Sequence, residues 1–105
     1  MAEYDFHPEA DIDLDEIWEY IADASVSAAD RVAAQIHRVL ENVAHFPYSG
    51  HRRTDLTNRP LRFIRVRDYL IAYAPDEKPL WVIAVMHGHR SPRVMAAILR
   101  SREKR

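Results

Sequence analysis

The sequence has no cysteine and only two glycines among its 105 residues. Without cysteine there can be no disulfide framework and no thiolate zinc site, which fits a cytoplasmic protein. The longest apolar run covers residues 80–86, far short of the roughly 20 residues that a membrane helix needs. The first residues are acidic and polar, so we expect no secretory signal and no membrane partner.

Basic residues are missing from the first 30 positions. That segment carries ten Asp or Glu, whereas residues 31–105 hold all 15 basic residues and six acidic ones. The net charge of −1 is therefore the sum of −10 on residues 1–30 and +9 on residues 31–105. Thirteen of the basic residues are arginine, which suits contacts with carboxylates, phosphates and aromatic rings. The asymmetry indicates either two solvated faces of opposite sign or a surface for an anionic partner.

The chain does contain a regular series of amphipathic segments. Alternation from Ala2 to His7 predicts a short first strand. Apolar residues at three- and four-residue steps predict a helix of about 15 residues that begins at Pro8. A second helix is expected from about Ala28 to Phe46, with Ser27 as its N-cap.

Three β-prone runs follow, over residues 61–66, 69–73 and 80–86. Their short connectors are typical of two consecutive hairpins. Adjacent apolar residues at 63 and 64 indicate either a bulge or burial on both faces. Ser91 and Pro92 suit the start of a closing helix.

The predicted order is β-α-α-β-β-β-α in a single domain over residues 1–105. We expect the α+β class: a helix hairpin packed on a small twisted antiparallel sheet, with a short C-terminal helix. Trp18 and Trp81 are expected in the core.

The last predicted strand ends in His87-Gly88-His89-Arg90. His87, Arg90 and Arg65 are the candidates for acid/base work and phosphate binding. Its place at the end of a buried strand favours a hydrogen-bonded structural role for His87, and Arg90 is equally compatible with a salt bridge to the acidic N-terminal half. Two imidazoles on one strand face could bind a metal, but no carboxylate is near in sequence, so we expect no metal and no cofactor.

Several apolar, aromatic and cationic residues are further candidates for partner binding. Arginines beside tyrosines can bind nucleic acid by phosphate contact and stacking, although solvated strand positions and packed tyrosines explain them as well. The candidates are Ile12, Trp18, Arg62, Arg65, Arg67, Tyr73, His89 and Arg90.

Four motifs in order resemble the RelE/ParE superfamily of bacterial type II toxins, and the ParE-like branch (plasmid stabilisation proteins) most closely. The first helix is similar to the family's A-x3-L-x2-I-x2-Y pattern, and Phe46-Pro47-x2-Gly50-x-Arg52 is similar to its P-x-x-G-x-x-R turn. Arg62 with Tyr69 to Tyr73 resembles R…Y-L-I-x-Y, and the 83–90 segment resembles V-x-H-G-x-R.

The resemblance implies a toxin neutralised by a cognate antitoxin that wraps the helix hairpin and the sheet. The complex is expected to be a heterotetramer or larger, and to contact operator DNA only through the antitoxin. ParE-type members poison DNA gyrase, whereas RelE-type members cut messenger RNA on the ribosome.

Two residues expected of the ribonucleases are absent. Position 70, where they place an arginine, is Leu70, and no tyrosine follows Tyr73. The resemblance therefore favours a non-enzymatic gyrase inhibitor, with a ribosome-dependent endoribonuclease as the alternative. A relative without toxicity, which only binds its antitoxin, is the third possibility.

Overall fold

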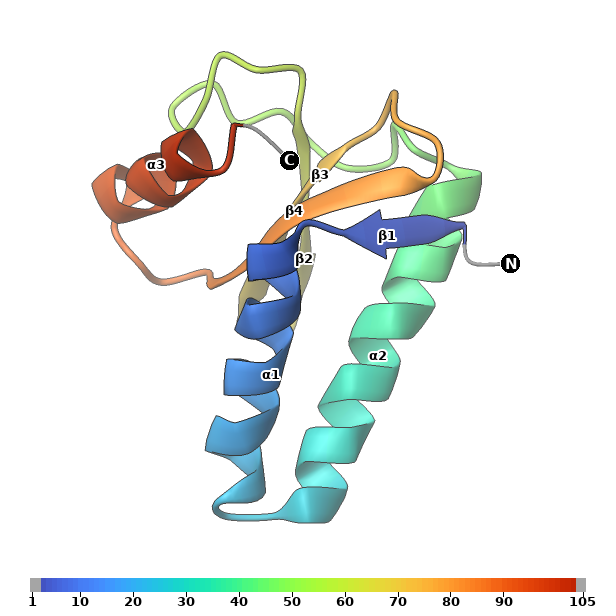
Figure 1. The fold of residues 1–105 in the computed structure, drawn as a ribbon, viewed down its shortest axis with the longest axis vertical. Helices are drawn as coiled ribbons and strands as arrows, with labels where there is room; N and C mark the ends of the chain where they lie inside the picture. Colours follow the sequence, from blue (N-terminus) through green and yellow to red (C-terminus); the bar gives the residue numbers. More distant parts are fainter. Residues whose placement is uncertain (1–2, 104–105) are drawn as a thin grey trace.

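The computed structural model describes residues 3–103 and has the predicted order of elements. A helix hairpin lies on one side of a four-stranded sheet, and a third helix lies on the other side (Figure 1). The elements are β1 (Tyr4–Phe6), α1 (Pro8–Ala22), α2 (Val26–His45), β2 (Arg62–Val66), β3 (Tyr69–Ala74), β4 (Leu80–His87) and α3 (Pro92–Ser101). The α+β class is confirmed.

Polar residues set the helix starts. Pro8 occupies the first turn of α1, as predicted, and Ser91 caps α3 by accepting a hydrogen bond from the backbone N–H of Val94 at 3.3 Å. The predicted cap of α2 at Ser27 is wrong. Ser25 is the cap, because its extended backbone lets its Oγ accept from the N–H of Ala28 at 3.1 Å.

The sheet has the strand order β1-β4-β3-β2. The antiparallel β2-β3-β4 meander confirms the two predicted hairpins. Only β1 departs from the expected antiparallel sheet, because it pairs in parallel with β4, Tyr4 opposite Leu80. Ala2, where the predicted first strand began, lies outside the described residues.

Both faces of the sheet are covered. Buried residues such as Ile36, Leu40 and Ile71 form a core under the hairpin, and Phe63, Leu70 and Met95 belong to a second core under α3. Burial on both faces, rather than a bulge, therefore explains the apolar pair in β2. The irregularity in register lies between β3 and β4 instead.

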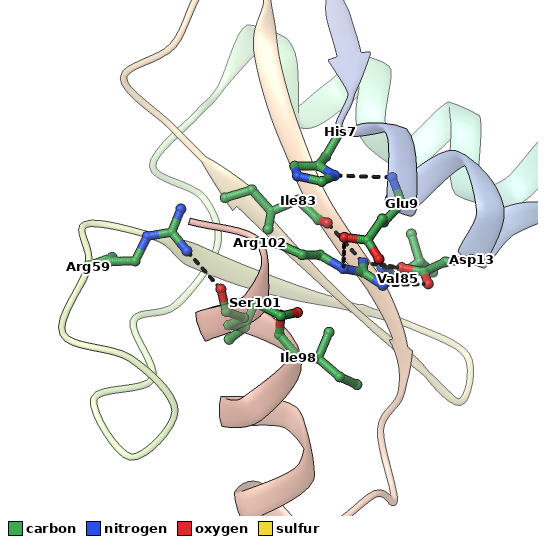
Figure 2. Close-up of polar contacts among 10 residues, drawn as sticks. His7, Glu9, Asp13, Arg59, Ile83, Val85, Ile98, Ser101 and Arg102 are labelled. Atoms are coloured by element: carbon green, nitrogen blue, oxygen red, sulfur yellow. Dashed lines mark hydrogen bonds and ion pairs between the residues drawn. The ribbon is translucent and has the colours of Figure 1, made fainter. Parts of the chain in front are cut away.

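Side chains complete the edge of β4 beyond the end of β1, which reaches only Val82. An Asp13 carboxylate oxygen accepts from the N–H of Val85 at 2.9 Å, and Arg102 donates to the carbonyl of Ile83 at 3.1 Å. Arg102 and Asp13 also pair with each other at 2.6 and 3.0 Å. This clamp joins α1, β4 and the end of α3 (Figure 2).

Candidate partner-binding surfaces

The end of β4 gathers three of the predicted site residues. The His87 ring packs against Tyr69 and His89, with ring centroids 5.0 and 5.2 Å away. The guanidinium of Arg65 lies so close to Gly88 that a methyl group there would fall 2.8 Å from its Nη1 atom. A side chain at position 88 would therefore displace the end of the Arg65 side chain.

His87 is held by packing rather than by a hydrogen bond. Its Nδ1 atom is buried and has no hydrogen-bond partner within residues 3–103. Burial lowers the pKa of His87, the charges of His89 and Arg90 lower it further, and Asp68 opposes them. The ring is therefore neutral at pH 7, and it could exchange a proton with a group brought to it.

We expect the protein to lose stability in acid partly through His87. Because the folded-state pKa lies below the unfolded value, this contribution is present above the unfolded pKa and is lost as the pH falls through the folded one. The free energy of unfolding, measured with urea at about pH 7.5 and 5.5, should fall less in His87→Asn than in the wild type. His51→Asn, at an exposed histidine, is the matched control. Equal falls in His87→Asn and the wild type would contradict this expectation.

Arg90 and His89 both lie exposed beyond the end of β4. Within residues 3–103, no ion pair involves Arg90, so the salt bridge considered from the sequence does not form. Both side chains are available to a partner, although the His89 ring also packs against His87.

Tyr73 is not available, and its prediction as a partner contact is corrected. Its side chain is fully buried; its hydroxyl donates to the carbonyl of Pro47 at 2.8 Å and accepts from the N–H of Gly50 at 2.9 Å. Arg62 supports the same turn by donating to the carbonyl of Gly50 at 2.9 Å, and its guanidinium lies 5.2 Å from the ring centroid of Tyr48. These residues fix the turn after α2.

Apolar side chains are exposed along the helix hairpin. Ile12 and Val26 are 54% and 55% exposed, as expected of a docking surface, and Tyr20 is 74% exposed. Trp18 was expected in the core, but the residue is 36% exposed, and its Nε1 donates to Asp30 at 3.0 Å across the two helices. Trp81, by contrast, packs against the second core.

A cavity of about 240 Å³ lies between α1 and α2, lined in part by Leu14, Trp18 and Ile36. Asp11 and Asp15 also line it. The hairpin therefore offers a mainly apolar depression with acidic groups to a partner.

A groove of about 680 Å³ runs between α2 and β2 and has the opposite charge. No Asp or Glu of the described residues lines it. The sequence predicted the arginines of the β2 wall as partner contacts but not those of the α2 wall. The seven-residue spacing of Arg31 and Arg38 was the signal that could have found them. We call it the arginine groove after the side chains of Arg31, Arg38 and Arg67; Arg65 also lines it, but its guanidinium lies at Gly88.

Residues 3–103 contain neither a candidate metal site nor a candidate membrane-spanning helix. No cluster of three or more His, Asp or Glu there is arranged to hold a metal ion. No helix in this part is long and apolar enough to span a membrane.

Residues 4–92 match the family model described as the ParE toxin of the type II toxin–antitoxin system, parDE. The chain belongs to the ParE toxin family. This confirms the resemblance, because the match covers most of the chain and includes the hairpin and all four strands. No curated protein matches the sequence. Membership of the ParE family implies a cognate antitoxin as partner.

Proposed function

We propose that this toxin inhibits DNA gyrase by protein–protein contact in the bacterial cytoplasm and is held inactive by its antitoxin. The main support comes from position 70. Leu70 is buried in the core under α3, where the ribonucleases of the superfamily present an arginine. A side chain in that core cannot contact a phosphate, so the sheet lacks a central cation for RNA cleavage.

The antitoxin is proposed to cover the hairpin and the end of the sheet. Ile12, Val26 and Trp18 offer apolar contacts on the hairpin, and Arg90 and His89 offer polar ones at the sheet end. Exposed apolar side chains of this kind are typical of interfaces that a partner helix covers. The complex is proposed to be a heterotetramer or larger and to reach operator DNA through the antitoxin.

A supercoiling assay with purified gyrase and relaxed plasmid tests the proposal. We expect micromolar toxin to stop supercoiling, and an equimolar amount of antitoxin to restore it. Full gyrase activity in the presence of folded toxin would contradict the proposed target.

One observation favours an endoribonuclease as the second candidate: the Arg65 guanidinium lies against Gly88, the residue next in sequence to the neutral His87. Such a pair can supply a phosphate-binding cation and a proton acceptor. This function predicts ribosome-dependent cleavage of messenger RNA that is lost in His87→Ala while the melting temperature stays close to wild type. Intact transcripts in the presence of toxin and ribosomes would exclude it.

A further inference from the structure

We propose that the arginine groove binds the phosphate backbone of duplex DNA, so that the toxin contacts the DNA that gyrase holds as well as the enzyme. The place of this DNA at gyrase rests on the proposed function, whereas the binding of a duplex by the groove does not. Three features of the groove carry the inference: cations without protein counter-ions, a lining without aromatic anchors, and a strained arginine.

The groove holds three guanidinium groups that no carboxylate of the protein neutralises. Arg31, Arg38 and Arg67 are exposed, and none of them forms an ion pair among the described residues. Asp30, the neighbour of Arg31 in sequence, instead accepts from Trp18 across the two helices of the hairpin. No Asp or Glu of the described residues lines the groove, so the groove attracts anions from solution.

The cations lie in a row that suits successive phosphates. Arg31 and Arg38 are seven residues apart on α2, which separates them by about 10 Å along the helix axis. Arg67 reaches the same row from the turn between β2 and β3, because its Nε donates to the Gln35 amide oxygen at 2.6 Å. Gln35 and Asn42 also line the groove, and their amide N–H groups can donate to phosphate oxygens.

The rest of the lining separates a duplex from a protein or a single strand. Protein interfaces are centred on aromatic or large apolar anchors, and none of the exposed large hydrophobic side chains of the described residues lines this groove. Single-strand sites stack bases on aromatic rings, and the described part of the lining includes no aromatic residue. The paired bases of a duplex need no such platform, so duplex DNA fits this lining best.

Arg67 adds an independent observation. It lies in the two-residue turn between β2 and β3 with φ at 54°, the left-handed region that favours glycine. A long side chain held in such a position, at a cost in backbone strain, points to a use for that side chain. The hydrogen bond to Gln35 directs the guanidinium into the groove, where it supplies the third cation.

Fluorescence anisotropy with a labelled DNA duplex measures the binding directly. Three phosphate contacts on a duplex of about 20 base pairs predict a slope of about −2.7 for the logarithm of the binding constant against that of salt. The dissociation constant should therefore rise roughly 40-fold between about 50 and 200 mM salt. Arg31→Glu/Arg38→Glu should bind at least about tenfold more weakly than the wild type at the lower salt.

The matched control is Arg93→Glu/Arg100→Glu, which changes two exposed arginines of α3 with the same seven-residue spacing. Both double variants change the net charge equally, so a difference between them reports where the charge lies. The control should bind the duplex within about threefold of the wild type. Equal weakening in both double variants would overturn the inference, because net charge alone would then explain the binding.

Arg67→Gly separates a phosphate contact from a purely structural role. Glycine relieves the left-handed strain, so the melting temperature should stay the same or rise by up to about 4 °C. The salt slope should become shallower, from about −2.7 to about −1.8, because one phosphate contact is lost. Arg67→Lys should retain the wild-type slope. A lower melting temperature with an unchanged slope in Arg67→Gly would contradict the third contact.

The binding assay and the supercoiling assay fail separately. Wild-type toxin that inhibits gyrase but does not bind the duplex at low salt would overturn the inference and leave the proposed function standing. Toxin that binds the duplex but leaves gyrase fully active would remove the proposed target, and with it the place of the DNA at gyrase. Tighter binding of a duplex RNA, a single strand or an acidic peptide than of duplex DNA would overturn the assignment to DNA.

Discussion

Replacing Arg102 with alanine is expected to lower the free energy of unfolding by about 3 kcal/mol. The Arg102 side chain is 10% exposed and that of Asp13 is 15% exposed, so the pair is largely shielded from water. Removing Arg102 leaves the Asp13 carboxylate without its two charged hydrogen bonds and the Ile83 carbonyl without its donor. The hydrogen bond to Asp13 is also the main cause that raises the pKa of Arg102 above its usual value.

Urea unfolding of three variants measures this effect. Asp13→Ala should cost a similar amount, because it removes the two charged hydrogen bonds of the guanidinium and leaves the N–H of Val85 unpaired. Asp15→Ala, at an exposed position of the same helix, should change the unfolding free energy by less than about 0.5 kcal/mol. A loss below about 1 kcal/mol in both Arg102→Ala and Asp13→Ala would show that the clamp contributes no more than a surface salt bridge.

Gly50→Ala is expected to destabilise the toxin by about 3 kcal/mol and to lower its melting temperature by roughly 10 °C or more. A methyl group at position 50 would lie 2.5 Å from the Tyr73 hydroxyl and 2.8 Å from the carbonyl oxygen of Phe63. Neither can retreat easily, because Tyr73 is fully buried and Phe63 pairs with His51. The added methyl must therefore displace the turn or break its hydrogen bonds.

Tyr73→Phe separates the loss of the turn's hydrogen bonds from the steric displacement of the turn. It keeps the packing of the ring but leaves the N–H of Gly50 and the carbonyl of Pro47 unpaired, at about 1–3 kcal/mol for each buried group. Tyr48→Phe removes a hydroxyl from a side chain that is 60% exposed and serves as the control. Thermal unfolding followed by circular dichroism can compare the variants. A Gly50→Ala protein as stable as the wild type would contradict the contact geometry.

Local signals explain what the sequence predicted correctly. The periodicity of the two helices and the short connectors of the meander depend on neighbouring residues, so they can be read without the fold. The error at the start of α2 arose because Ser25 and Ser27 both satisfy the rules for a helix cap. Only the extended backbone of Ser25 decides between them.

The remaining errors came from contacts between distant segments. The parallel pairing of β1 with β4 depends on residues near opposite ends of the chain. Tyr73 was expected to contact a partner, but it lies beneath a turn that begins 26 positions earlier. Arg31 and Arg38 acquire their importance only when β2 forms the opposite wall of the arginine groove. The sequence pattern of a single segment cannot predict contacts between segments that are distant in the chain.

The Asp13–Arg102 clamp joins residues 89 positions apart in sequence. During synthesis, the α1–α2 hairpin can form early because its contacts are local, whereas the edge of β4 closes only after residue 102 has left the ribosome. Contacts between such distant residues also slow folding. The nascent toxin therefore lacks this clamp until residue 102 has been made.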